Sequence, residues 1–428
     1  MDRQGIFGVI CSLAGVAVAA GCLWWAAELR ARQDAEALAR EARQVLDMGL
    51  ERAPDLGEID AARAKKLLER AREHSDSPQL RGQLARARAL AALQRGDLEA
   101  AAEQLKQARS LLDAEGETGL GLWLLAAALA EAQGDPEARA RAVAAARALE
   151  PMAPRALLAA ADLALDGHKP AQALALLDPL VERLSLLPSL YNRRGLAREA
   201  LGDLGAARAD YERAAELDPG AHQPRINLGR LARQRGELEA AEDAFTAAIA
   251  REQGTHEAWL GRGLVRLELG DEKGGELDLQ AARQRAPALP GPLMALGDLD
   301  VRRGAFDAAL RRYEAAQLLA PDDAVVWLKL GNTHVRRGEL ETAERAYDRA
   351  IALEPTLAAA HNGLGAVGLA RDREAEARAA LERAASLDAH DPNPLLNLAR
   401  LHEKYGRRAE ARAARERAEA RTVQLALR

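Results

Sequence analysis

Few aromatic and cysteine residues occur in this sequence of 428 residues, and both shortages limit what it can build. Phe, Trp and Tyr make up 3% of the residues, so a core built mainly from large rings is excluded. Both cysteines, Cys11 and Cys22, lie near the start of the chain. The rest of the chain therefore has no disulfide framework and no cysteine–zinc site.

An excess of positive charge is also absent, since 60 basic and 65 acidic residues give a net charge of −5. Without a basic field, nucleic acid is not an expected partner. None of the 8 histidines forms a close pair with another histidine or with a cysteine, so no metal site is predicted. The sequence has no phosphate-binding loop, dinucleotide motif or nucleophile elbow. We therefore expect no cofactor, no catalytic residue and no enzyme activity.

What the sequence does contain is a regular series of glycines, each 34 residues after the previous one. They are Gly195, Gly229, Gly263, Gly297, Gly331 and Gly365. A fixed period of this length indicates stacked repeats. With these glycines at position 8, repeats begin at Pro188, His222, His256, Pro290, Ala324 and Ala358. Further repeats begin near Gly82 and at Leu120, Pro154 and Pro392, which makes about ten, or eleven with a degenerate copy at 45–78.

Each repeat is predicted to be a helical hairpin. Position 15 is a glycine that supplies the left-handed backbone of a turn, as in Gly96, Gly134, Gly202, Gly236, Gly270, Gly304, Gly338 and Gly406. Prolines end the second helices, namely Pro151, Pro219, Pro287, Pro321 and Pro355. Small residues at positions 8 and 20 allow close helix approach. A large residue at position 24 is expected in the core, as are aromatic residues at position 4, such as Trp327.

This set of residues resembles the tetratricopeptide repeat family over roughly residues 82–425, and most closely over 188–387. The resemblance implies an all-α fold, a right-handed solenoid of about ten to eleven helix-turn-helix repeats. It also implies a scaffold whose inner groove, lined by the first helices, binds peptides or helices of other proteins.

In this family, the groove is lined from positions 2, 5, 6, 9, 12 and 13 of the first helix. The groove residues implied here include Asn192, Arg193, Asn227, Arg230, Arg233, Asn332, Arg336, Asn362, Asn397 and Arg400. Asparagine hydrogen-bonds a peptide backbone as donor and acceptor, and arginine pairs with carboxylates. Gly363 stands where a carboxylate clamp of the chaperone-binding members needs a second asparagine, so that specificity is not predicted.

The N-terminus contains an uncharged stretch, residues 6–27, that is long enough to cross a bilayer as one helix. Trp24 and Trp25 stand at its distal end, where aromatic rings favour the membrane interface. We expect an uncleaved anchor at 1–27, entry helices with a degenerate repeat at 28–81, and the solenoid at 82–425. Small residues on one face of the anchor, Gly8, Ser12, Gly15 and Ala19, allow self-association.

Two alternatives to a single-pass anchor remain open. The stretch also fits a secretory signal peptide. The sequence from Ala19 to Cys22 loosely resembles a lipobox, which makes Cys22 a possible lipidation site. Basic residues after the span, Arg30 and Arg32 among them, favour a cytoplasmic body at a bacterial inner membrane, whereas lipidation would place the body on the other side.

These features lead to the expectation of a membrane-anchored scaffold that recruits partner proteins through peptide segments held in its groove. The alternative is a periplasm-facing lipoprotein or an export adaptor for pilus, secretion or envelope polysaccharide assembly.

Overall fold

The computed structural model describes residues 30–31, 33–46, 60–114, 119–250 and 255–426, and this part of the chain contains helices and no strand. The predicted membrane segment at 6–27, its small-residue face and Cys22 lie outside the described residues. No helix in the described ranges combines the length and the apolar character needed to span a membrane. The chain divides into two compact units, 1–219 (unit 1) and 220–428 (unit 2).

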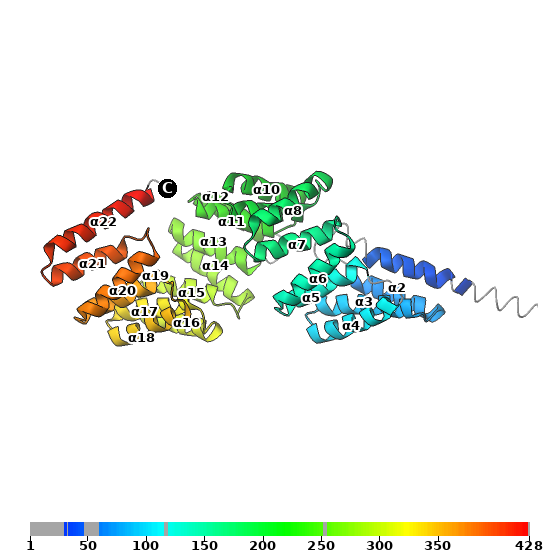
Figure 1. Ribbon diagram of the computed structural model, residues 1–428, viewed down its shortest axis with the longest axis horizontal. Coiled ribbons are helices and arrows are strands. Elements are labelled where there is room, and N and C mark those ends of the chain that lie inside the picture. Colours follow the sequence, from blue (N-terminus) through cyan, green and yellow to red (C-terminus); the bar gives the residue numbers. More distant parts are fainter. Residues whose placement is uncertain (1–29, 32, 47–59, 115–118, 251–254, 427–428) are drawn as a thin grey trace, which may run out of the picture. The chain divides into compact units, whose positions relative to one another are not determined.

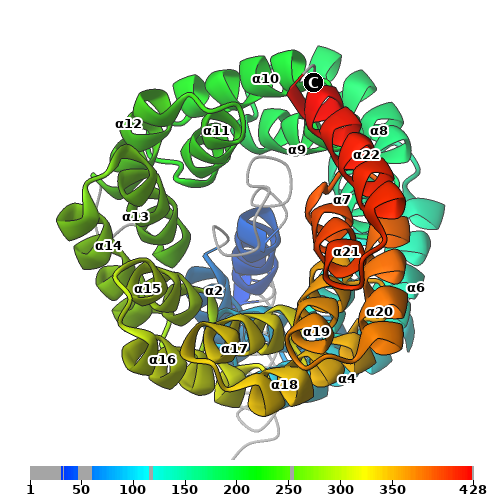
Figure 2. The same cartoon turned by 90° about the vertical axis from the view of Figure 1, so that its left-hand side faces the viewer.

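Unit 1 begins, in its described part, with helical residues 33–46, which share a hydrophobic cluster with α2 and α3. Its further helices are α2 (Ala61–His74), α3 (Pro78–Gln94), α4 (Leu98–Ala114), α5 (Leu120–Ala132), α6 (Pro136–Leu149), α7 (Pro154–Asp166), α8 (Pro170–Arg183), α9 (Pro188–Ala200) and α10 (Leu204–Leu217) (Figures 1 and 2).

Unit 2 consists of further helices of similar length. They are α11 (Gln223–Gln234), α12 (Leu238–Ile249), α13 (His256–Leu269), α14 (Glu272–Arg285), α15 (Gly291–Arg302), α16 (Phe306–Leu319), α17 (Ala324–Arg337), α18 (Leu340–Leu353), α19 (Ala358–Ala370), α20 (Glu374–Leu387), α21 (Asn393–Lys404) and α22 (Arg408–Ala426). Figure 2 shows that α13, α15, α17 and α19 form an inner layer, and that α14, α16, α18 and α20 form an outer layer.

The helices from α3 to α22 pair in sequence as ten antiparallel hairpins, so the all-α fold and the expected number of helix-turn-helix repeats are confirmed over the described residues, while the membrane helix expected before them lies outside those residues. The second helices α10 and α16 end at Leu217 and Leu319, just before Pro219 and Pro321, as the prolines predict. The first of these hairpins starts earlier than the expected boundary near Gly82, because the Ser77 side chain caps α3 by accepting a hydrogen bond from the Leu80 amide.

The turns within the hairpins depend on the predicted glycines. All eight have a positive φ, between 69° and 90°. His168 and Asp372 occupy the same position in two other repeats with φ of 53° and 61°, which the sequence pattern did not predict. Left-handed backbone is costly for a residue with a Cβ, so these two turns carry local strain.

The 34-residue period arises from a close contact between the two helices of a repeat. A Cβ added to Gly297 would lie 2.5 Å from the Tyr313 ring, and one added to Gly331 would lie 2.6 Å from the Tyr347 ring. The other four glycines of the series meet their position 24 residue in the same way, at 2.5 to 3.0 Å. In these six repeats glycine lets the large residue pack flat against the first helix, because a Cβ would collide with that residue.

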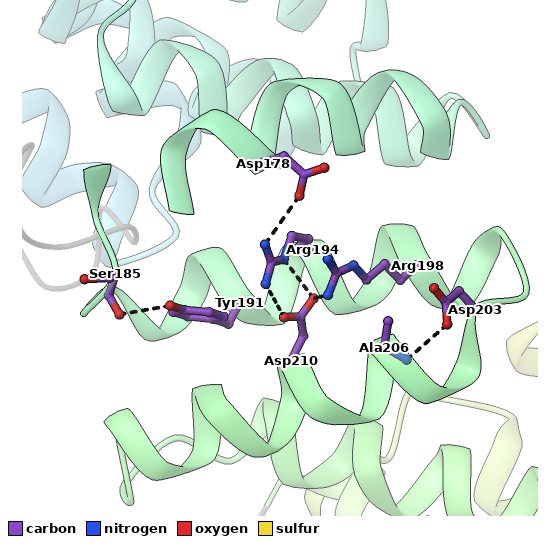
Figure 3. Close-up of polar contacts among 8 residues, drawn as sticks. All are labelled: Asp178, Ser185, Tyr191, Arg194, Arg198, Asp203, Ala206 and Asp210. Atoms are coloured by element: carbon purple, nitrogen blue, oxygen red, sulfur yellow. Dashed lines mark hydrogen bonds and ion pairs between the residues drawn. The ribbon is translucent and has the colours of Figure 1, made fainter. Parts of the chain in front are cut away.

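The aromatic residue at position 4 has a polar role in addition to its place in the core. Trp327 Nε1 donates to the carbonyl oxygen of Pro321 over 2.9 Å, and the Tyr191 hydroxyl donates to that of Ser185 over 3.1 Å (Figure 3). In both cases the acceptor lies six residues earlier, in the loop that joins successive repeats. In these two repeats the side chain therefore ties the loop to the helix that follows it.

A buried ionic cluster joins α9 to α10. Figure 3 shows Arg194 and Arg198 of α9 converging on Asp210 of α10, with Nη2 of Arg194 and Nη1 of Arg198 at 2.6 and 2.8 Å from its carboxylate oxygens. The Asp210 side chain is 4% exposed. Burial opposes the charge of Arg194, but the hydrogen bond and charge of Asp210 outweigh it, and the pKa of Arg194 is raised.

The same cluster recurs two repeats later. Arg262 and Arg266 of α13 contact Asp278 of α14, at 2.8 and 3.0 Å. The next repeat exchanges the signs, since Asp300 on the first helix faces Arg312 on the second at 3.0 Å. Each buried charge therefore lies beside a charge of opposite sign, and these ion pairs join the first helix of a repeat to its second helix.

Candidate functional site

The inner side of unit 2 carries a hollow of about 460 Å³ between α15, α17 and α19. Three of the predicted groove residues, Asn332, Arg336 and Asn362, line it together. The other lining residues are Asp298, Val301, Tyr313, Lys329, Thr333, Val335, Tyr347, Gly363 and Ala366. This mixture of amide, charged and apolar side chains is what the sequence predicts for a peptide-binding surface.

Two buried tyrosines reach the hollow from the outer helices, which sequence reasoning missed. The Tyr313 hydroxyl donates to Asp298 Oδ1 over 2.6 Å, and the Tyr347 hydroxyl donates to Asn332 Oδ1 over 2.8 Å. Position 24 was predicted as core, and both side chains are indeed buried. The signal that could have revealed their second role is the choice of tyrosine where other repeats have Phe245 or a leucine.

The tyrosine hydroxyls act as hydrogen-bond donors. Burial raises the pKa of Tyr313 well above its ordinary value, and the hydrogen bond to Asp298 raises it further. Burial also raises the pKa of Tyr347. Both hydroxyls therefore stay protonated near neutral pH and hold Asp298 and Asn332 in fixed orientations.

One basic side chain at the hollow has an acidic partner among the described residues, and another has none. Lys329 Nζ lies 2.7 and 2.8 Å from the two carboxylate oxygens of Asp298, which compensates that acid. Arg336 is exposed, its guanidinium lies 5.6 Å from the centre of the Phe306 ring, and it forms no ion pair with any described residue. The hollow thus offers one guanidinium for an acidic group.

Asn362 and Asn397 form a short polar ladder between α19 and α21. Asn362 Oδ1 accepts from Asn397 Nδ2 over 2.9 Å, and Arg400 donates to Asn397 Oδ1 over 3.3 Å. Since Asn332 and Asn362 both accept through Oδ1, their amide N–H groups remain free of partners among the residues the structure describes. A bound peptide carbonyl could accept hydrogen bonds from these groups.

The remaining predicted residues lie elsewhere. Asn192 and Arg193 are on α9 in unit 1, where Arg193 Nε donates to Asp162 Oδ1 over 2.6 Å. Arg193 also lines a separate hollow in that unit.

On α11, Asn227 is only 3% exposed, and its Oδ1 accepts from Gln223 over 3.5 Å. Because Asn227 is buried, a ligand in the groove cannot reach its side chain. Arg233 donates to Glu268 Oε1 through Nε and Nη2, at 2.9 and 2.6 Å, while Arg230 is exposed. Only three of the predicted groove residues therefore line the hollow in unit 2.

Within the described ranges, no three His, Cys, Asp or Glu side chains are grouped so as to hold a metal ion.

Comparison with known families matches residues 226–290, 294–356 and 328–394 to a model described as tetratricopeptide repeat. Residues 188–221 match a second model with the same description. A comparison with curated protein sequences finds no significant match.

Several solved structures are similar to this chain. The hetero-tetramer Cut9–Hcn1 of APC/C has 17% identity and a TM-score of 0.54, over 81% of this chain and 74% of that chain. The human IFIT1 dimer with PPP-AAAA has 16% identity and a TM-score of 0.50, over 90% of this chain and 99% of that chain. Yeast Tom70 has 18% identity and a TM-score of 0.48, over 92% of this chain and 96% of that chain.

At these identities, the two structures with TM-scores of 0.54 and 0.50 show the fold alone. The matched repeats coincide with the 34-residue period, with the hairpins of α9 to α20, and with the glycine contacts inside them. The central part of this chain therefore consists of tetratricopeptide repeats.

Proposed function

We propose that this protein is a scaffold that binds an extended peptide segment of a partner protein in the hollow of unit 2. The observation that carries the proposal is the convergence of Asn332, Asn362 and Arg336 on one hollow, where the two amides have unused N–H donors. The proposal includes no catalytic step.

The lining suggests how such a peptide is held. The amide groups of Asn332 and Asn362 donate to peptide carbonyls, which recognises any extended backbone. Val301 and Val335 accept apolar side chains. Arg336 selects for an acidic side chain, because its guanidinium has no competing ion pair among the described residues.

The test measures partner capture by the full-length chain and by two variants, Asn332→Ala and Arg336→Gln, with quantitative mass spectrometry. Partners that bind in the hollow should be reduced about tenfold or more by Arg336→Gln, as expected for loss of a hydrogen bond to a charged group, and about threefold to tenfold by Asn332→Ala, which removes a hydrogen bond between neutral groups. Arg349→Gln on α18 is the matched control, because this arginine is 48% exposed on a helix of the outer layer. Equal capture by all four proteins would refute the assignment.

We also propose that residues 6–27 anchor the scaffold in a bacterial inner membrane. Support comes from the uncharged length of this stretch and the tryptophans at its end. A reporter fused after Arg428 would reveal on which side of the membrane the repeats lie. The second candidate, a periplasm-facing lipoprotein or export adaptor, is favoured by the sequence around Cys22. Incorporation of labelled fatty acid that is lost in Cys22→Ala would support it over the single-pass anchor.

A further inference from the structure

Position 11 of the repeat lies where the first helix packs against the second, and three repeats place a charge there. These position 11 residues are Arg198 (Figure 3), Arg266 and Asp300. Position 23 of the same repeats supplies the opposite charges, from Asp210, Asp278 and Arg312. In these three repeats, a charge between the packed helices is therefore compensated from the facing helix.

The repeat that begins at Pro392 departs from this arrangement. Its position 11 is His402 of α21, and its position 23 is Ala414 of α22, a buried residue that offers no counter-charge. The His402 side chain is partly buried, its Nδ1 has no hydrogen-bond partner, and it forms no ion pair with any described residue. A neutral imidazole is tolerated in this place, whereas an imidazolium would be a charge without a partner.

Two guanidinium groups oppose the protonation of His402. Arg407 comes from the turn between α21 and α22, and Arg378 comes from α20. Both arginines donate to Glu374 Oε1, so this carboxylate is already engaged, and the Nε atoms of both are buried without a partner. Burial is the main cause that lowers the pKa of His402, and the two arginines lower it further.

The remaining charged groups around His402 do not offset these effects. Glu410 of α22 and Glu382 of α20 favour its protonation, but each acts more weakly than either arginine. The other helix that packs on α21 is α19, and its sequence contains no Asp, Glu, Lys or Arg. The surroundings of the imidazole therefore favour its uncharged form from every helix that contacts α21 in the described residues.

The hairpin that carries His402, α21–α22, also lacks a packing residue. Position 24 holds a large buried side chain in the central repeats, but here it is Arg415, of which 53% of the side chain is exposed. The attachment to α20 depends on a hydrophobic cluster in which Leu395 and Leu398 of α21 join Leu381 of α20. Without the large residue, less apolar surface is exposed when the hairpin opens, so opening costs less.

We propose that His402 makes the attachment of α21–α22 to α20 sensitive to acid. Near neutral pH the imidazole is uncharged and the hairpin stays packed. In mildly acidic solution the open hairpin takes up a proton on His402 in water, which the packed state resists, so the open form gains population.

Opening would also affect the hollow of unit 2. Asn397 of α21 donates to Asn362 Oδ1 at that hollow over 2.9 Å, so the support of Asn362 is lost when α21 leaves. Acid would thereby weaken ligand binding there. This consequence rests on the function proposed above, whereas the opening of the hairpin does not.

Hydrogen exchange of the full-length chain, measured by mass spectrometry for peptides from 393–426, tests the proposal. Protection factors, corrected for the intrinsic exchange rates, should fall about tenfold from about pH 7 to about pH 5. The unfolded pKa of 6.5 limits the fall to about 25-fold. In His402→Gln the fall should be less than about threefold, because the group that takes up the proton is gone.

Two further variants separate charge from structure. Ala414→Asp supplies at position 23 the carboxylate that other repeats have there, so the fall in acid should disappear or reverse. A purely structural effect of this substitution would not change the pH dependence. His334→Gln is the matched control, because His334 also stands at position 11 but its Nδ1 lies 2.6 Å from Glu339 Oε2. It should leave the fall at 393–426 unchanged.

Three results would overturn the proposal. They are equal protection at the two pH values in the original chain, an equal fall in His402→Gln, and a fall that Ala414→Asp leaves unchanged. Should Ala414→Asp fail to fold, the comparison of the original chain with His402→Gln decides alone. Partner capture is not part of this measurement, so a failure of the function proposed for unit 2 leaves its outcome unaffected.

Discussion

Replacement of Asp210 by alanine should strongly destabilise the α9–α10 hairpin. It removes the common partner of Arg194 and Arg198, whose side chains are 14% and 24% exposed in their pairs with Asp210. Loss of one partner from a buried ion pair costs about 3–5 kcal/mol, because a charge stays buried without compensation. Since both guanidiniums keep some contact with water, we expect the lower end of that range. The exposed Arg208→Ala on the same helix should cost less than about 1 kcal/mol.

The neighbouring repeat shows which residues could replace the buried ionic cluster without leaving an unpaired charge. Where the repeat that begins at Pro188 has two arginines and an aspartate, the following repeat has Leu228, Ala232 and Ala244 at the same positions. A triple variant of the Pro188 repeat with Leu, Ala and Ala should therefore be far more stable than the single Asp210→Ala variant, because no unpaired charge remains.

Hydrogen exchange of the full-length chain, followed by mass spectrometry of peptides from 188–217, measures this difference locally. Repeat proteins open region by region, so a global unfolding curve would blur the effect. At about 1.4 kcal/mol per tenfold change, Asp210→Ala should speed exchange in this segment about a hundredfold, and the triple variant by much less. If the triple variant exchanges as fast as the single one, the buried-charge reasoning is wrong.

Three further predictions concern packing, backbone strain and pH. Gly297→Ala should destabilise unit 2 by about 1–3 kcal/mol in urea unfolding, because its Cβ would lie 2.5 Å from Tyr313, whereas Gly205→Ala, with no atom within 4 Å, should stabilise by about 0.5–1 kcal/mol. His168→Gly should raise stability by about 0.5–1 kcal/mol in the same assay, because it relieves a φ of 53°, and a loss would show that the imidazole has an important contact. Burial, aided by nearby arginines, lowers the pKa of His402, so its neutral form is favoured in the folded state. Its contribution is complete above the unfolded pKa of 6.5 and is lost as the pH falls below it, so the unfolding midpoint should drop less between about pH 7 and pH 5 in His402→Asn than in the original chain.

Much of the fold follows from local features of the sequence. The glycines of position 15, the prolines after the second helices and the close helix approach at the position 8 glycines are all confirmed, whereas the contact between positions 8 and 24 appears only in the structure. These features act within one hairpin, so their effect does not depend on the rest of the chain. The early start of α3 and the strained turns at His168 and Asp372 were not predicted, because the outer repeats and two turns use different residues for the same backbone.

The candidate site was predicted less completely. The pattern placed Asn332, Arg336 and Asn362 on inner helix faces, and the structure brings them to one hollow. The same pattern did not predict that Asn227 is buried or that the Tyr313 hydroxyl donates a hydrogen bond to Asp298. Such contacts depend on how far apart two helices lie, which a residue spacing along one helix does not reveal.

The amino-acid sequence by itself thus determined the period, the hairpins and the turns, because each is decided by small groups of residues close together in the chain. The tertiary structure alone decided which polar groups meet, including the amides around one hollow and the two arginines that share Asp210. These groups come from different helices, and only the packing of those helices sets the distances between them.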